Sequence, residues 1–177
     1  MLNGAVLNSG SIRELILTPT EGQLPLVEGW ASLDEQVQAS GFDFRLLRVY
    51  RLLTAGRMGS SADDRILPEN ESMEFEDNGW VFLEAGSYLV TLCEVVNMPL
   101  DLMALALPRS SLLRSGVGLY TAVWDPGYRG RSQALLTVHN PSGYMIQQYS
   151  RLMQMVFFRL SNPTAEGYSG RYQDERP

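Results

Sequence analysis

Short apolar segments separated by turn-forming residues recur along most of this chain, and this pattern limits the fold more than any other feature. The segments are rich in Val, Leu, Tyr and Phe, and Gly, Pro or Asn interrupts them about every 8 to 12 residues. Such spacing is typical of an antiparallel sandwich or barrel with little helix. The candidate strands are residues 42–53, 80–83, 87–96, 103–107, 119–123, 133–139 and 153–160.

Two short helices complete the expected secondary structure. The first begins near Ser11, because Ser11 and Glu14 have the spacing of a capping box, and Pro19 ends it. The second follows Pro108-Arg109-Ser110-Ser111, where either serine is placed to cap it. A chain of 177 residues is long enough for one domain with a sizeable core and too short for two comfortable ones. We therefore expect residues 1–177 to form a single, mainly β domain.

The charge is distributed unevenly along the chain. Residues 1–101 contain 6 Arg and 16 carboxylates, a net charge of −10, whereas residues 102–177 contain 8 Arg and 4 carboxylates, a net charge of +4. The chain has no Lys. Residues 54–79 hold much of the acidic excess, which predicts a solvated loop or an excursion from the sheet, with a metal site as the alternative. The net charge of −6 argues against a nucleic-acid polymer as a partner.

The cysteine and histidine content excludes several kinds of site. The chain has one Cys, Cys93, and one His, His139, so it cannot form an internal disulfide or a Cys/His zinc cluster. Cys93 lies in a strand-like run and is expected to be a buried small apolar residue. No apolar run approaches the roughly 18 residues needed to cross a bilayer, and the start of the chain lacks a signal-peptide pattern. We expect a cytoplasmic protein with no membrane partner.

Two stretches carry residues suited to chemistry. In residues 108–116, Arg109 and two Ser hydroxyls at a helix start would suit a phosphate oxygen, or the stretch is a plain strand-to-helix turn. In residues 120–131, Asp125-Pro126-Gly127-Tyr128 predicts a tight hairpin. Asp125 is the only carboxylate between Leu102 and Ala165, a span with six Arg. It is therefore either a structural ion-pair partner or a catalytic base kept ionised by its neighbours.

These two stretches resemble, in order and spacing, the second and third motifs of the trimeric dUTPase and dCTP deaminase superfamily. Gly41-Phe42-Asp43-Phe44-Arg45 is similar to the first motif and residues 151–157 to the fourth. Residues 168–173 resemble the C-terminal closing segment of the archaeal and deaminase-like branch. The resemblance covers about residues 11–173. It implies a distorted antiparallel β-barrel or jelly-roll subunit of the dUTPase-like β-clip type, a homotrimer, and active sites at subunit interfaces.

The superfamily supports two reactions, and one missing residue favours hydrolysis. In the deaminases a Glu on the strand after the third motif relays protons while water attacks the cytosine ring. Residues 126–164 contain no Asp or Glu, and the corresponding strand, residues 131–138, has no carboxylate. The resemblance therefore implies a dUTP diphosphatase that forms dUMP and pyrophosphate. A dCTP deaminase, mono- or bifunctional, and a non-catalytic nucleotide-binding regulatory trimer are the alternatives.

The resemblance also assigns roles to individual residues. Asp125 would orient and activate the water that attacks the α-phosphorus, and Tyr128 would pack beneath the deoxyribose. The backbone from Tyr120 to Asp125, which includes Thr121 and Val123, would pair with the edge of uracil. The residues implied to hold the triphosphate are Arg109, Ser110, Ser111 and Gln154. Mg²⁺ would bind mainly phosphates and waters, with Asp43 as an outer-shell partner through water.

The C-terminal tail, residues 161–177, is expected to be a flexible arm that closes over an active site. Tyr168 or Tyr172 would stack near the base and Arg171 would reach the γ-phosphate, with Gln173 in the same segment. The alternative is a disordered terminus.

Overall fold

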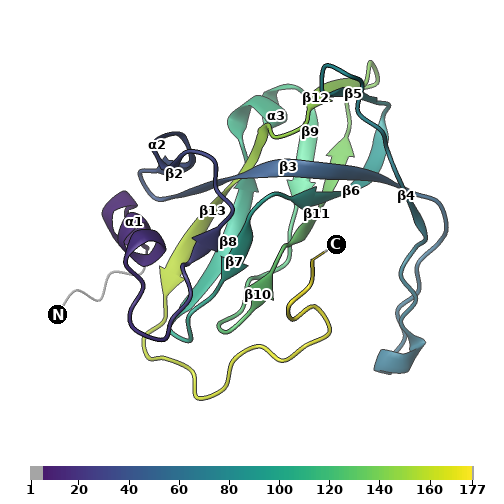
Figure 1. Ribbon diagram of the computed structural model, residues 1–177. Helices are drawn as coiled ribbons and strands as arrows, with labels where there is room; N and C mark the ends of the chain where they lie inside the picture. The colour runs from purple at the N-terminus through teal and green to yellow at the C-terminus, as the bar shows by residue number, and fades with distance from the viewer. Residues whose placement is uncertain (1–5, 177) are drawn as a thin grey trace.

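The computed structural model describes residues 6–176 of the chain (Figure 1). Residues 1–5, at the start of the expected domain, and Pro177, at the end of the expected arm, lie outside the described residues. In the described part of the chain, no helix is long and apolar enough to cross a membrane.

Strands dominate the structure, and helices are short. The helical segments are α1 (Ser9–Leu17), α2 (Leu33–Gln36), α3 (Ser110–Arg114) and the 3₁₀ turn η1 (Ala62–Asp64). The strands are β1 (Val27–Glu28), β2 (Val37–Gln38), β3 (Gly41–Leu52), β4 (Asn70–Ser72), β5 (Trp80–Leu83), β6 (Gly86–Leu92), β7 (Val95–Asn97), β8 (Leu102–Pro108), β9 (Val117–Tyr120), β10 (Arg129–Gly130), β11 (Gln133–Val138), β12 (Tyr144–Gln147) and β13 (Arg151–Arg159). The predicted mainly β fold is confirmed.

One antiparallel sheet forms a nearly closed barrel. Its strands follow the order β8-β13-β3-β6-β11-β9, and β2 and β4 also pair with β3. The two ends of this order approach each other, because Ala104 in β8 and Trp124 just after β9 exchange backbone hydrogen bonds of 3.0 and 3.1 Å. Two smaller sheets, β1-β7-β10 and β5-β12, complete the fold. The predicted distorted antiparallel barrel is therefore confirmed.

The core fills the inside of this barrel. In β11, residues alternate between buried and partly exposed, so that Ala134, Leu136 and Val138 point inward. Phe42 and Phe44 on β3 are buried and meet edge to face, with ring centroids 5.4 Å apart. Each such large apolar side chain contributes roughly 1.5–3 kcal/mol on burial, which makes the barrel a firm support for its loops.

Both helix caps differ from the expectation. The helix α1 begins at Ser9, two residues before the expected start, and the Asn8 side chain caps it by accepting a hydrogen bond of 2.9 Å from the Ser11 backbone N–H. The expected capping box at Ser11 is therefore wrong. At α3 the N-cap residue is Arg109, without a side-chain cap, so Ser110 and its neighbour are helical residues with exposed side chains. The expected serine cap is also wrong.

Two predicted strands are interrupted, and one strand pair was missed. The expected strand 87–96 bends at Cys93 and Glu94 and forms β6 and β7. The expected strand 119–123 leaves the sheet after Tyr120. In the ribbon of β5 and β12 only β5 was predicted, because the expected strands include residues 80–83 but not residues 144–147. The predicted excursion of residues 54–79 is confirmed for residues 54–69, which extend away from the barrel at the lower right of Figure 1, but residues 70–72 return to the sheet as β4 beside β3.

Candidate active site

Residues Asp125 to Tyr128 form a tight turn, but the predicted hairpin is wrong. The Tyr128 backbone N–H donates to the carbonyl of Asp125 over 3.1 Å, and Gly127 has a φ of +82°, a left-handed value that glycine adopts without steric cost. It is not a hairpin, because β9 pairs with β11 and β10 pairs with β7. The backbones of Gly127 and Tyr128 are instead hydrogen-bonded to Met98 over 3.0 and 2.8 Å. These bonds fix the turn to the end of β7.

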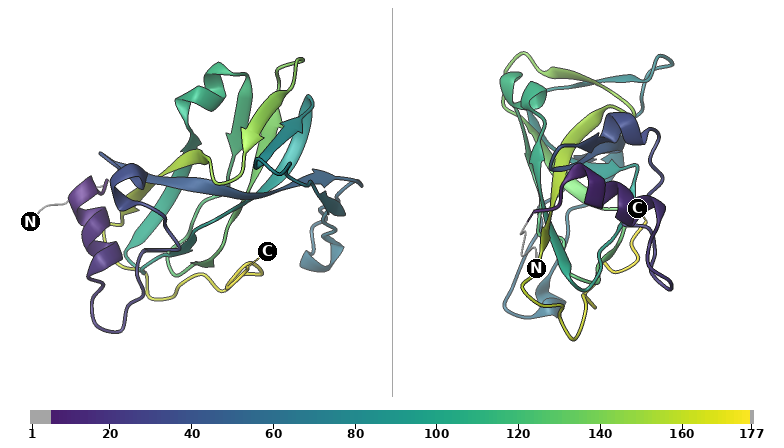
Figure 2. Two further views of the ribbon diagram at one scale, coloured as in Figure 1. Left: turned by 45° about the horizontal axis from the view of Figure 1, so that its top comes forward. Right: turned by 90° about the vertical axis from the view of Figure 1, so that its left-hand side faces the viewer.

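The C-terminal tail lies against this turn. The Tyr168 N–H donates to the carbonyl of Pro126 over 2.7 Å, and the Gln173 side-chain amide donates to the carbonyl of Gly127 over 3.0 Å. Farther along, the Arg131 N–H donates to the carbonyl of Glu175 over 2.8 Å. In Figure 1 the yellow tail passes below the barrel and returns toward β10, and Figure 2 shows the same course. The tail therefore forms a wall beside the turn.

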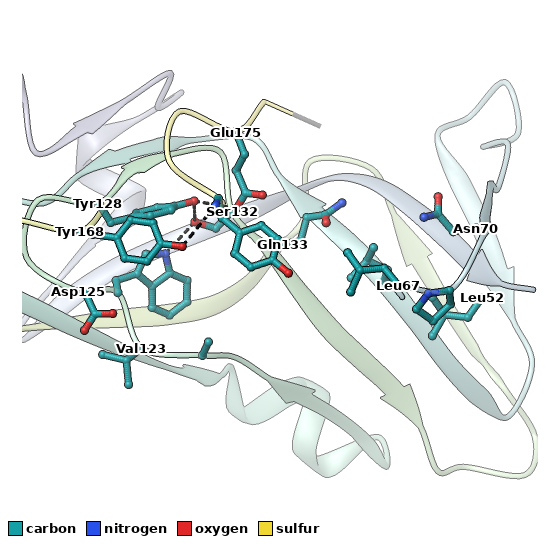
Figure 3. Close-up of a pocket in the computed structure, with 15 residues that line it drawn as sticks. Leu52, Leu67, Asn70, Val123, Asp125, Tyr128, Ser132, Gln133, Tyr168 and Glu175 are labelled. Carbon is teal, nitrogen blue, oxygen red and sulfur yellow. Dashed lines mark hydrogen bonds between the residues drawn. The ribbon is translucent and has the colours of Figure 1, made fainter. Parts of the chain in front are cut away.

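A cavity of about 580 Å³, the tail pocket, opens between the turn, the tail and the base of the acidic excursion (Figure 3). Five predicted site residues share it, among them the catalytic candidate Asp125, which is exposed. The lining residues are Leu52, Leu67, Pro68, Asn70, Leu89, Ala122, Val123, Trp124, Asp125, Tyr128, Ser132, Gln133, Tyr168, Tyr172 and Glu175. With one face apolar and a few convergent polar groups, it suits a small organic ligand.

Several polar side chains of the tail pocket form hydrogen bonds with one another. Tyr128 is 7% exposed, and its hydroxyl lies 2.9 Å from a carboxylate oxygen of Glu175 and 3.2 Å from the Ser132 hydroxyl. The Trp124 indole N–H donates to the same Ser132 oxygen over 2.7 Å. Burial raises the pKa of Tyr128 and also that of Glu175. The Tyr128 hydroxyl is therefore protonated at neutral pH and available as a donor.

A second group of predicted residues, the cationic cluster, lies on the outer face of β3 and β13. Asp43 is 2% exposed, and its Oδ2 atom is 2.9 Å from Arg109 Nη1 and 3.5 Å from Arg151 Nη1. Gln154 stands opposite Asp43 in the neighbouring strand, and Ser110 and Ser111 are the first two residues of α3, next to Arg109. Burial raises the pKa of Asp43, and the two arginines oppose that shift. Two guanidinium groups, on side chains about one-third exposed, surround one carboxylate and leave a net positive site.

The tail pocket and the cationic cluster do not meet within one chain. Ala104 pairs with Trp124 beside the pocket, and Arg109 follows five residues later along β8. At about 3.3 Å per residue, this places the two sites roughly 16 Å apart along the strand. The sequence-predicted catalytic residue and the predicted phosphate ligands therefore occupy opposite ends of β8.

Four predicted residues lie outside both groups of contacts. Tyr120 is exposed, with its hydroxyl 3.4 Å from His139 Nε2, and Thr121 next to it does not line the tail pocket. Arg171 is exposed. Gln173 bonds to the backbone of the turn and lines a shallower cavity on the other side of it. The structure thus assigns Gln173 to tail docking.

Sequence reasoning missed several residues that shape these sites. Trp124, Ser132 and Glu175 form the polar contacts of the tail pocket, and Arg151 is the second arginine on Asp43. Trp124 and Arg151 lie within the stretches that resemble the third and fourth motifs, and Ser132 follows closely after the third, which is a usable signal. Glu175 gave no local signal, because it reaches the pocket only through the course of the tail. Its carboxylate lines the tail pocket, whereas the strand β11 has no carboxylate.

The described residues do not form a metal site of their own. Among residues 6–176, no group of three or more His, Cys, Asp or Glu side chains could hold a metal ion. Asp43, the predicted outer-shell partner, already contacts two arginines. This donor set fits an ion that arrives bound to phosphates and waters and touches the protein only through a water.

Comparison with known proteins assigns the chain to a class. A family model described as dCTP deaminase-like matches residues 7–160. The crystal structure of 2'-deoxycytidine 5'-triphosphate deaminase from Agrobacterium tumefaciens has a TM-score of 0.64 at 24% identity over 88% of this chain. The present chain spans about half of that protein, 48% of its length, so this likeness shows a shared fold.

Sequence relatives match over almost their full length. The chain is 41% identical over 170 residues to a probable deoxyuridine 5'-triphosphate nucleotidohydrolase of Methanococcoides burtonii, covering 96% of this chain and 98% of that relative. It is 46% identical over 171 residues to the protein of the same name from Archaeoglobus fulgidus, covering 97% of each. The chain belongs to the dCTP deaminase-like family, and the resemblance drawn from the motifs is confirmed.

Proposed function

We propose that this chain is a dUTP diphosphatase, which hydrolyses dUTP to dUMP and pyrophosphate. The observation that carries the proposal is the tail pocket, which places the exposed carboxylate of Asp125 beside the buried ring of Tyr128. The strand β11 on the opposite wall contributes no carboxylate. Relatives named deoxyuridine triphosphate nucleotidohydrolases, 41–46% identical over nearly the whole chain, support it.

Some pocket residues would bind the nucleoside, and Asp125 would promote hydrolysis. Tyr128 would lie beneath the deoxyribose, and the backbone from Ala122 to Trp124 would pair with the uracil edge. Cytosine would present a donor where uracil presents an acceptor, which leaves a buried polar group unpaired and disfavours dCTP. The carboxylate of Asp125 would accept a proton from a water and orient it toward the α-phosphorus. As the water oxygen bonds to the α-phosphorus, the bond between that phosphorus and the α,β-bridging oxygen breaks, which releases dUMP and pyrophosphate.

The cationic cluster would hold the triphosphate. Arg109 gives one guanidinium donor to Asp43 and keeps others free for phosphate oxygens, next to Ser110, Ser111 and Gln154. Arg171 on the exposed tail would add a further cation when the tail closes. Mg²⁺ bound to the phosphates and waters would neutralise charge that develops on the phosphoryl oxygens, with Asp43 as an outer-shell partner.

The proposed assembly is a homotrimer with active sites between subunits. Within one chain the cluster and the pocket are roughly 16 Å apart, so a complete site needs the pocket of one subunit and the cluster of another. The outer face of β8 and β13 also carries a contiguous apolar stripe, in which Leu105 is 43% and Leu107 68% exposed. The other members of the stripe are Met103, Val156 and Phe158. This stripe ends at the cationic cluster and supports a contact between copies.

One observation favours the alternative activity, dCTP deamination. The tail brings Glu175 into the pocket, where it provides the carboxylate that β11 lacks. That carboxylate already accepts the hydrogen bond of Tyr128, which places it beside the proposed sugar position. We therefore keep hydrolysis as the function. A cytoplasmic location is proposed with it, because the substrate is a free nucleotide.

Subunit complementation tests both the chemistry and the interfacial site. Asp125→Asn should lower kcat for dUTP by about 10²- to 10⁴-fold while dUTP still binds. Arg109→Ala should raise KM strongly. When the two variants are co-expressed, mixed trimers should regain roughly a quarter of wild-type activity, because each partner supplies its intact half with a probability of one half. No recovery would place both residues in a site within one subunit, and wild-type kcat in Asp125→Asn would make Asp125 structural.

A further inference from the structure

Three hydrogen bonds form a directed chain across the tail pocket (Figure 3). The indole of Trp124 is a donor only, so it donates to the Ser132 oxygen. The Tyr128 hydroxyl donates its single proton to a carboxylate oxygen of Glu175. The Ser132 hydroxyl must then donate to the Tyr128 oxygen. Every bond points toward Glu175, which is the terminal acceptor.

The residues at both ends of this chain of hydrogen bonds are held in place by backbone pairing. Trp124 is paired with Ala104 at the closing seam of the barrel. At the other end, Glu175 forms a parallel bridge with Gly130. The ring of Tyr128 lies between these two anchors. Its hydroxyl position depends on a tail residue that lies 47 residues away in the sequence.

The ring face of Tyr128 is constrained as well. The ring of Tyr168 meets it edge to face, with centroids 5.6 Å apart and an angle of 71° between the planes. The Tyr168 hydroxyl in turn accepts a hydrogen bond of 3.3 Å from the Tyr172 backbone N–H. The tail therefore restrains Tyr128 at its hydroxyl and at its face, and burial of the ring leaves little room for another rotamer.

We propose that Glu175 is a positioning residue for sugar selection: it holds the Tyr128 ring against the C2′ position, so that a 2′-hydroxyl does not fit. The proposal rests on the proposed function, in which Tyr128 packs beneath the deoxyribose. Without Glu175 the Tyr128 hydroxyl loses its terminal acceptor, and the ring gains the freedom to tilt away from the sugar. A ribonucleotide would then be accommodated. Glu175 acts through Tyr128 and takes no part in the hydrolysis itself.

The test compares kcat/KM for dUTP and UTP, with the trimer and the full chain intact. Glu175→Ala should lower the preference for dUTP about tenfold, chiefly through a rise in kcat/KM for UTP. Glu175→Gln should keep most of the preference, because its amide oxygen still accepts from Tyr128. Glu166→Ala removes an exposed tail carboxylate outside the tail pocket and should leave both values unchanged.

A double-mutant cycle isolates the contact. Tyr128→Phe keeps the ring and loses the hydroxyl, so it should lower the preference about as much as Glu175→Ala, and the double variant should show no further loss. An unchanged preference in Glu175→Ala and Tyr128→Phe, or fully additive losses in the double variant, would overturn the proposal. Should Glu175→Ala fail to fold, Tyr128→Phe alone must still show the loss. Failure of the wild type to hydrolyse dUTP would instead refute the proposed function.

Discussion

The contact between Gly127 in the turn and Gly167 in the tail leaves no room for a methyl group. A Cβ atom on Gly127 would lie 2.6 Å from the Cα atom of Gly167 and 2.9 Å from the backbone N of Tyr168. These are backbone atoms, so no rotation of a side chain relieves the overlap. Gly127 also has a φ of +82°, which costs an alanine about 1–2 kcal/mol. Gly127→Ala should therefore displace the tail from the turn.

The size of the displacement caused by Gly127→Ala follows from the steric overlap and the backbone strain. Each 1.4 kcal/mol changes an equilibrium about tenfold, so strain and overlap together should raise the population of the undocked tail by at least about tenfold. Limited trypsin digestion, followed by mass spectrometry, measures this as faster cleavage after Arg171. The dUTP KM should rise in parallel, because the proposed closing arm is displaced.

A matched variant separates strain from overlap. Gly22→Ala carries the same conformational penalty at a φ of +81°, but no atom lies within 4 Å of the added Cβ. It should leave the Arg171 cleavage rate unchanged. Gly167→Ala approaches the same contact from the tail side, 3.0 Å from Gly127 Cα, and should release the tail. Equal Arg171 cleavage rates in Gly127→Ala and Gly22→Ala would refute the docking of the tail on this turn.

Three further predictions concern the core and the surface. Glu94 is fully buried and accepts hydrogen bonds from Arg45 and Gln36, so Glu94→Gln turns one acceptor into a donor against the Arg45 N–H. It should cost about 2–4 kcal/mol and lower Tm by roughly 5–15 °C in a thermal melt, and a change under 2 °C would contradict the role of this pair. Burial raises the pKa of Cys93 to about 12. Because the thiolate fraction then stays low throughout this range, iodoacetamide labelling of the native protein should remain far slower than that of an ordinary thiol at both pH 7 and pH 9, and a rate like that of an ordinary thiol would show an exposed Cys93. Leu107→Arg in the exposed stripe should reduce the proposed trimer to monomers in light scattering, and a trimer that stays intact would place the interface elsewhere.

The sequence predicted those parts of the fold that depend on local patterns. The alternation in residues 133–139 gave β11, and the polar composition of residues 54–79 gave the excursion from the sheet. The break between β6 and β7 could not be predicted, because Glu94 turns inward to Arg45, which lies 49 residues away. The strand β12 was missed although Tyr144 and Ile146 favour strands, because its four residues are too few to show a clear alternation without their partner β5.

The sequence predicted those site residues that lie within the matched motifs. Asp125 and Tyr128 share the pocket as the motifs imply, and Asp43, Arg109 and Gln154 lie together on another face. The roughly 16 Å between the two groups could not be deduced from motif order, since it arises from the length of β8. Glu175 was missed because its position depends on how the whole tail docks.

Product analysis with competing substrates separates dUTP hydrolysis from dCTP deamination. The purified chain is incubated with Mg²⁺ and an equimolar mixture of dUTP and dCTP, and nucleotides and pyrophosphate are separated by anion exchange. The account predicts dUMP and pyrophosphate in equal amounts, with dCTP left intact. Deoxyuridine nucleotides formed from dCTP, or dUTP that stays unhydrolysed, would contradict it.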